Sequence, residues 1–293
     1  MASESTHEVD KLSGITTTGH EWDGLKELNN PLPRWWLYTM YLTIVWGVIY
    51  MFLYPTWPLV TTYTKGLWGY SSRGDVAKDL ADLQAARGDN MKLLATTKLE
   101  DIPKNEQLVS FVRAYARTAF GDNCAPCHGA GAGGVKGHYP NLLDDDWLWG
   151  GKLSDIEKTI RFGIRSGHDE ARVGDMPAFG RDGILKPDQI DAAADYVLSL
   201  SNQPVENKAN IAKGAAVFKE QCASCHGEDG KGKQEFGGPN LTDAIWLYGS
   251  DKATIVYGLN NGRGSVMPQW QGRLDEPTIK ALAVYVHALG GGK

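Results

Sequence analysis

The stretch CAPCH at residues 124–128 returns as CASCH at residues 222–226, and the two copies contain all four cysteines of the 293-residue chain. A Cys-x-x-Cys-His run is typical of c-type haem attachment, in which two thiols form thioether bonds to the porphyrin and the histidine binds the iron. The pattern therefore predicts two covalently bound haem c groups. The residues that would hold them are Cys124, Cys127, His128, Cys222, Cys225 and His226.

Two other uses of cysteine explain these motifs less well. A thioredoxin-like redox pair is expected within a βαβ unit, whereas glycine-rich runs follow both motifs here, at residues 129–137 and 227–238. A structural zinc ion shared by four cysteines leaves the histidine after each pair unexplained. The doubled motif thus favours haem.

Downstream methionines supply candidates for the second axial ligand of each iron. Met176 lies in GDMPAF, 48 residues after His128. Met267 lies in SVMPQW, 41 residues after His226. The proline after each methionine restricts the backbone of a loop that has to hold a weak ligand. Histidine and methionine together fill the coordination sphere of the iron, which favours electron transfer over oxygen binding.

Three other histidines, His138, His168 and His287, compete with the methionines as ligands. The strongest competitor is His168, which lies eight residues before Met176. It has no counterpart in the second copy, so we interpret it as a solvated loop histidine.

The pairing of methionines with irons stays open at this level. We expect pairing within each copy, His128 with Met176 and His226 with Met267, because an exchange needs a specific interface between the copies. The segment before Met176 is longer than the matching segment before Met267, and this extra length would allow a crosswise exchange.

The two halves align beyond the haem motifs, which indicates an internal duplication. A Pro-Asn-Leu triplet recurs at residues 140–142 and 239–241, and a tryptophan follows each asparagine by six residues. Each half ends in a stretch with apolar residues at helical spacing, at residues 187–200 and 276–289.

On these residues, positions 105–290 resemble class I c-type cytochromes. The resemblance implies two tandem domains, residues 105–204 and 205–293, in which an N-terminal and a C-terminal helix cross beside each haem. It also implies that the carbonyls of Pro140 and Pro239 accept the second N–H of the axial histidines, which orients the imidazoles. About 90 residues bury little core unaided, and a covalently held haem adds apolar surface.

Residues 35–54, WWLYTMYLTIVWGVIYMFLY, contain no charge and are long enough to span a bilayer core. Aromatic residues at both ends suit the membrane interfaces, and the segment ends in YPTWP rather than in the small residues of a signal-peptide cleavage site. We therefore expect an uncleaved transmembrane helix surrounded by lipid. Basic residues flank it equally, so charge leaves the orientation undecided.

Haem attachment decides the orientation, because it takes place outside the bacterial cytoplasmic membrane. We expect residues 1–34 in the cytoplasm, a single pass through the inner membrane, and both haem domains in the periplasm. Residues 55–104 form the periplasmic linker, with a short helix at 76–87 and a loop at 96–105. The fold class is thus mainly α, with one N-terminal transmembrane helix followed by two tandem class I cytochrome c domains. The net charge is −5, and no basic patch or phosphate loop predicts binding of nucleic acid.

An acidic N-terminal segment leads through NNPLPRWW, residues 29–36, into this single span and the two haem motifs. The combination resembles the di-haem subunit III family of cbb3-type cytochrome c oxidases over essentially the whole chain. The resemblance implies electron transfer from a soluble cytochrome c or the bc1 complex towards a mono-haem c subunit and a catalytic haem–copper subunit. It implies no independent catalysis, since the chain has no cluster of intramembrane histidines.

Two alternatives from other classes stay open. One is a free-standing anchored di-haem carrier, whose cytochrome domains would look the same. The other is a di-haem peroxidase, in which one haem has to lose its sixth ligand. Methionine ligation of both irons speaks against a peroxidase.

Overall fold

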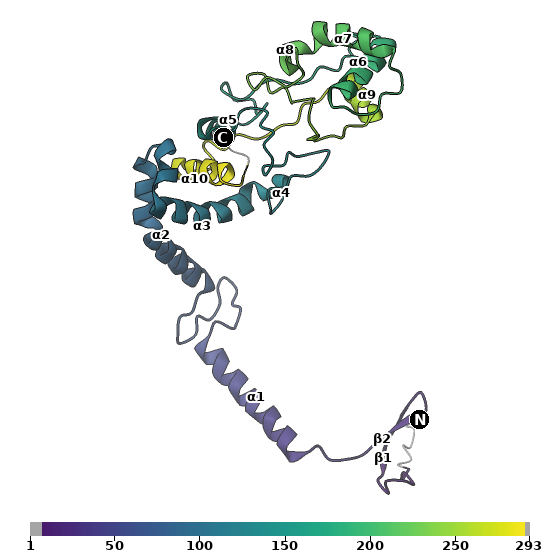
Figure 1. Ribbon diagram of the computed structural model, residues 1–293. Coiled ribbons are helices and arrows are strands. Elements are labelled where there is room, and N and C mark those ends of the chain that lie inside the picture. Colours follow the sequence, from purple (N-terminus) through teal and green to yellow (C-terminus); the bar gives the residue numbers. More distant parts are fainter. Residues whose placement is uncertain (1–7, 291–293) are drawn as a thin grey trace. The chain divides into compact units, whose positions relative to one another are not determined.

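The structure is a computed structural model that describes residues 8–290 and separates into two compact units, residues 1–84 and 85–293. The first seven residues of the predicted cytoplasmic segment and the last three of the second predicted cytochrome domain lie outside the described residues. Most of the regular structure is helical (Figure 1), which confirms the mainly α class.

The N-terminal unit contains a hairpin that the sequence analysis did not predict. Strands β1 (Thr17–Trp22) and β2 (Leu25–Leu28) pair antiparallel. Asp23 and Gly24 connect them with φ values of 47° and 87°. Two-residue hairpin turns with positive φ at both positions favour Asp-Gly, so this dipeptide was the available signal.

Helix α1 (Arg34–Leu53) is the predicted membrane span, displaced by one residue from the expected 35–54. Pro33 precedes it in an extended conformation, and Tyr54, which comes before another proline, is extended after it. None of its residues is buried, and with 20 residues and a mean hydropathy of 1.5 over an 18-residue window it is long and apolar enough to cross a bilayer.

The linker is more ordered than expected. Helix α2 (Ser72–Thr96) extends well beyond the predicted 76–87, and a 3₁₀ helix, η1 (Leu99–Lys104), replaces part of the predicted loop. The reason is tertiary packing: Leu94, Leu99 and Ile102 are buried in the core of the second unit. Helix stability in proteins comes mainly from such packing and less from intrinsic propensity. The end of the linker therefore belongs to the folded unit.

The second unit repeats one order of helices twice. The first copy comprises α3 (Glu106–Asn123), α4 (Ala125–His128), α5 (Leu153–Phe162) and α6 (Pro187–Leu200). The second comprises α7 (Asn210–Gln221), α8 (Ala223–His226), α9 (Lys252–Asn261) and α10 (Glu276–His287). The predicted helices at the end of each copy are α6 and α10.

The copies do not pack as two separate domains. Helix α10 of the second copy packs against α3 and α5 of the first, and α6 of the first copy packs against α7 and α9 of the second. Figure 1 shows the yellow α10 beside the blue-green α3 and α5. We call α3, α4, α5 and α10 lobe 1, and α6, α7, α8 and α9 lobe 2. The lobes cut across the sequence copies 105–204 and 205–293.

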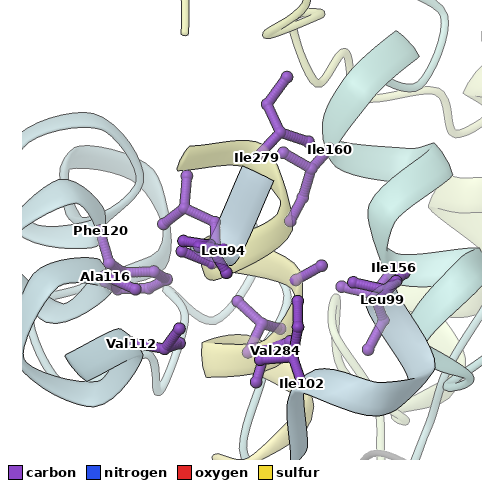
Figure 2. Close-up of a cluster of buried hydrophobic side chains, with 14 of the residues drawn as sticks. Leu94, Leu99, Ile102, Val112, Ala116, Phe120, Ile156, Ile160, Ile279 and Val284 are labelled. Carbon is purple, nitrogen blue, oxygen red and sulfur yellow. The ribbon is translucent and has the colours of Figure 1, made fainter. Parts of the chain in front are cut away.

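Amphipathic helices build the core of lobe 1 (Figure 2). In α3, Leu108, Val112, Ala116 and Phe120 recur every four residues and are all buried. The Asn105 side chain caps this helix by accepting the backbone N–H of Leu108. Helix α10 packs against this face of α3, so the apolar pattern of α3 forms a contact surface for a helix that is distant in the sequence.

Candidate functional site

The first haem motif occupies one helical turn at the end of α3. The backbone N–H groups of Cys127 and His128 both donate to the carbonyl of Cys124, at 3.1 and 2.9 Å. Gly129 then ends the turn with φ 80°. The turn holds both thiols and the imidazole within five residues, which is the arrangement that attachment to one porphyrin requires.

The second motif repeats this geometry at the end of α7. Cys225 and His226 donate to the carbonyl of Cys222 at 3.1 and 2.9 Å, and Gly227 ends the turn with φ 79°. The two motifs are therefore structural copies as well as sequence copies.

The histidine of each motif lies within hydrogen-bond distance of a proline carbonyl. His128 Nδ1 lies 3.1 Å from the oxygen of Pro140, and His226 Nδ1 lies 3.0 Å from the oxygen of Pro239. With Nδ1–H donating to the carbonyl, the lone pair of Nε2 is the one that remains for a metal. These are the contacts that the resemblance to cytochromes implied.

The ionisation of these groups suits metal binding better than thiol redox chemistry. Burial lowers the pKa of His128 and His226, which favours the neutral imidazole that ligates iron. Burial, with a smaller effect of the second cysteine of each motif, raises the pKa of the Cys124 and Cys222 thiols to about 11. A reactive Cys-x-x-Cys pair has a lowered thiol pKa, so these sites do not resemble thioredoxin.

The surroundings of each motif fit a porphyrin. Partly buried apolar side chains pack near both motifs against the lobe cores, and they offer the contact surface that a haem needs. In lobe 1 these are Leu142, Trp147 and Trp270, and in lobe 2 they are Leu241, Trp246 and Ile255. With paired thiols and an oriented imidazole, the residues present fit haem c.

The methionines lie against the lobes crosswise to their positions in the sequence. Met267 of the second copy packs against the core of lobe 1, which Cys124 also contacts. Met176 of the first copy packs against a buried cluster of lobe 2 that includes Val217 of α7. His168 is half-buried: its ring stacks on Phe162 at 4.8 Å. It is therefore less solvated than we expected.

Sequence reasoning missed Arg165, which joins the two methionine segments. Its Nε donates to the carbonyl of Ser265 at 2.6 Å, two residues before Met267. Its Nη1 donates to the carbonyl of Gly174, two residues before Met176. The second copy has Gly264 at the equivalent position, so the comparison of the two halves gave no signal for this residue.

An acidic cavity of about 210 Å³ is lined by the segments that follow the two haem motifs. Its carboxylates are Asp145, Asp146 and Asp243. Burial, and then the negative charges of Asp243, Asp144 and Asp145, raise the pKa of Asp146 from its ordinary value of 3.8 to about 6. Asp146 is thus a group whose ionised form is disfavoured in the folded protein.

Replacing Asp146 with asparagine is expected to change the pH dependence of stability. Because its pKa is raised, the carboxyl group of Asp146 binds a proton more tightly in the folded protein than in the unfolded chain. Protonation of Asp146 therefore stabilises the fold fully below about pH 4, and this contribution is lost as the pH rises through about 6. Denaturant unfolding of Asp146→Asn should show a flatter dependence over this range. The exposed Asp169→Asn is the control. An unchanged slope in Asp146→Asn would contradict the prediction.

Comparison with known protein families gives three consecutive matches. Residues 14–61 match the family described as the N-terminal domain of cytochrome oxidase-cbb3, FixP. Residues 114–201 match cytochrome c, and residues 209–286 match cytochrome C oxidase, cbb3-type, subunit III. The matches cover the anchor and both haem motifs.

Full-length relatives agree. The chain is 59% identical over 293 residues to a cbb3-type cytochrome c oxidase subunit FixP of Bradyrhizobium sp. (strain ORS 278), with complete coverage of both chains. It is 57% identical to FixP of Azorhizobium caulinodans over 99% of this chain and 98% of that protein. It is 53% identical to CcoP of Azospirillum brasilense over 98% and 99% of the two chains. The resemblance inferred from the sequence is thereby confirmed, and the chain belongs to the FixP/CcoP family of cbb3-type cytochrome c oxidase subunits.

Proposed function

We propose that this chain carries electrons through two covalently bound haem c groups towards the mono-haem and catalytic haem–copper subunits of a cbb3-type oxidase. As a member of this family it is an electron-transfer subunit of the oxidase complex and no independent catalyst. The observation that carries the proposal is the duplicated motif, in which each histidine is hydrogen-bonded to a proline carbonyl. Haem iron supplies the one-electron chemistry when it is bound.

The residues of the chain have distinct tasks at each site. The four cysteines hold the porphyrins through thioether bonds, which keeps each haem in place in both redox states. His128 and His226 supply the proximal ligands, and the carbonyls of Pro140 and Pro239 fix the orientation of the rings. Met176 and Met267, each followed by a proline that restricts its loop, would supply the second protein ligand of each iron.

The anchor places these sites beside the membrane-bound partners. Helix α1 crosses the bacterial inner membrane once, in contact with lipid, with the N-terminal segment in the cytoplasm and both lobes in the periplasm. The support is the length and apolar character of α1, together with haem attachment outside the cytoplasmic membrane. The donor is a soluble cytochrome c or the bc1 complex, whose electrons enter the haems from the periplasmic side.

Removing the cysteines of one motif is expected to remove one haem of two. Cys124→Ala/Cys127→Ala and Cys222→Ala/Cys225→Ala should each keep about half of the haem stain of the parent per mole of protein, because each porphyrin needs its own thiols. Haem staining of denaturing gels measures covalent haem only. Full stain in either variant would contradict haem attachment at that motif. Because haem is attached outside the cytoplasmic membrane, stain in the parent protein also indicates that the lobes reach the periplasm.

Copurification tests the place of the chain in the oxidase. The tagged protein, extracted in mild detergent from cells grown under conditions that express the oxidase, should carry a high-spin haem and copper in addition to its own haem c. The double-cysteine variants, each expected to keep one haem c, show which part of the absorption spectrum comes from the haems c of this chain. Isolation of the intact di-haem protein without a haem–copper partner would favour the free-standing carrier and overturn the assignment.

A further inference from the structure

Residues 55–70, which follow α1 and precede α2 (Figure 1), fold into a defined loop. An antiparallel bridge joins Pro58 to Tyr63. Inside this bridge, the backbone N–H of Leu59 donates to the carbonyl of Thr62 at 2.7 Å. The first half of the loop is therefore a short hairpin, and the four residues from Leu59 to Thr62 form its tip.

The second half of the loop returns to the end of α1. The backbone N–H of Leu67 donates to the carbonyl of Phe52 at 3.0 Å, and that of Trp68 donates to the next carbonyl, at Leu53, at 3.2 Å. The last carbonyls of a helix have no partner within the helix, so the loop satisfies two of them. Gly66 has φ 70°, and a Cβ there would collide with the Leu53 carbonyl. Glycine at this position thus permits the close return.

Aromatic rings pack the loop onto the helix end. The ring of Tyr54 stacks on that of Tyr50, one turn earlier, with centroids 4.4 Å apart. The rings of Trp68 and Tyr70 meet Tyr54 edge-on, at 5.0 and 5.4 Å. The loop and the last turn of α1 are therefore a single packed unit.

The outer surface of this loop is apolar. Lys65 is the one charged residue in the sequence from 54 to 70. The side chain of Val60 at the tip is fully exposed. Exposed apolar groups with so little charge indicate a contact with something other than water. The large apolar side chains that are more than half exposed are Trp57, Leu59, Val60, Tyr63, Leu67 and Trp68.

The length of α1 places this surface at the edge of the membrane. Relatives of the chain are subunits of a membrane oxidase, and α1 is its candidate span. At 1.5 Å per residue, the 20 residues of α1 extend about 30 Å, which is the thickness of a hydrocarbon core. No length remains to carry the loop away from the bilayer. The loop therefore starts where hydrocarbon meets headgroups, the depth that Trp and Tyr side chains prefer.

Backbone hydrogen bonding inside the loop suits a medium that contains little water. The hydroxyl of Thr64 accepts the backbone N–H groups of Trp57 and Thr56, at 3.0 and 3.4 Å. Pro55 and Pro58 have no N–H to satisfy. Polar backbone groups without a partner are costly near lipid. These internal contacts lower the cost of placing the loop at the membrane surface.

From these observations we propose that residues 55–70 form an interfacial hairpin that lies in the lipid headgroup layer and holds the end of α1 at a fixed depth. The apolar tip reaches the upper acyl chains, and the long side chain of Lys65 extends to lipid phosphates. A combination of Trp, Tyr and Lys side chains favours lipid as the contact over an apolar surface of another subunit. The proposal depends on the membrane span and is independent of the haem ligands.

A first test measures which medium surrounds the tip. In the intact oxidase, in nanodiscs of phosphatidylcholine and phosphatidylglycerol, Val60→Cys is labelled with a nitroxide. The parent protein gives the background from native thiols. Oxygen concentrates in lipid and a nickel chelate stays in water, so oxygen should relax the label at position 60 more strongly. The control Val173→Cys, at an exposed position in the second unit, should respond more strongly to nickel.

Both other outcomes would overturn the proposal. Equal nickel access at positions 60 and 173 would place the tip in water. Low access of both oxygen and nickel at position 60 would mean that another subunit covers the tip.

A second test asks whether the hairpin sets the depth of the helix. A nitroxide on Phe52→Cys, whose side chain is exposed, reports the depth of the last turn of α1. Leu59→Asp/Val60→Asp places two charges on exposed side chains of the tip, so it removes no packing contact within the chain but disfavours insertion into lipid. The ratio of oxygen to nickel access at position 52 should fall severalfold, whereas Val173→Asp should leave it unchanged. An unchanged ratio in the double variant would refute the role in fixing the depth.

Discussion

Alanine at Gly163 is expected to release Met267 from its position and to open the iron site of lobe 1. Gly163 has φ 75° and ψ −174°, a region that only glycine adopts readily, and a Cβ there would meet the Met267 carbonyl. The neighbour is backbone, so it has to shift. We expect a loss of about 3 kcal/mol in the free energy of unfolding, together with carbon monoxide binding at one haem. Denaturant unfolding and reduced-state spectra measure the two effects.

Gly167 offers a matched control four residues away. Its φ is 85°, but a Cβ there would have nothing within 4 Å. Gly167→Ala should therefore cost only about 1 kcal/mol, from the backbone conformation alone, and should leave both haems unable to bind carbon monoxide. Gly262→Ala should mirror Gly163→Ala at the other haem. Equal losses in Gly163→Ala and Gly167→Ala would show that the close approach to Met267 contributes nothing.

Replacing Lys252 with methionine is the second substitution with a large expected effect. Asp195 is completely buried, and Lys252 supplies the positive charge beside it. Removing one partner of a buried pair leaves an uncompensated charge, which costs about 3–5 kcal/mol. The amide of Asn210 still donates to Asp195, so we expect a value near the lower end. Denaturant unfolding followed by the absorption of the haems measures this loss in lobe 2.

Two further variants separate the charge effect from loss of packing. Lys213 of α7 pairs with Asp188 of α6, the helix that also carries Asp195, but the two side chains are 47% and 65% exposed. Lys213→Met should therefore cost less than about 1 kcal/mol. Adding Asp195→Asn to Lys252→Met removes the stranded charge and should restore part of the stability. A lack of any recovery would mean that Lys252 acts through packing.

The sequence predicted which residues form the haem motifs more completely than it predicted the helices that pack around them. Cys-x-x-Cys-His is contiguous, so one helical turn suffices to assemble thiols and imidazole, and the structure has that turn twice. The two contacts between histidine and proline were implied by the resemblance and are present. The lengths of α2 and η1 were missed because Leu94 and Ile102 are ordered by burial in a core that local propensity does not reveal.

By itself, the sequence determined the duplication, the membrane span, the haem motifs and the two methionines that follow them. These are local patterns, and each keeps its meaning whatever the rest of the chain does. Only the tertiary structure decided which copy each methionine and each terminal helix joins. Duplicated segments offer nearly the same surface to their own copy and to the other copy. A local sequence pattern therefore cannot tell whether a terminal helix packs within its own copy or against the other one. The choice comes from contacts between distant residues, such as Arg161 with Glu276 and Lys252 with Asp195, which form only once the chain has crossed over.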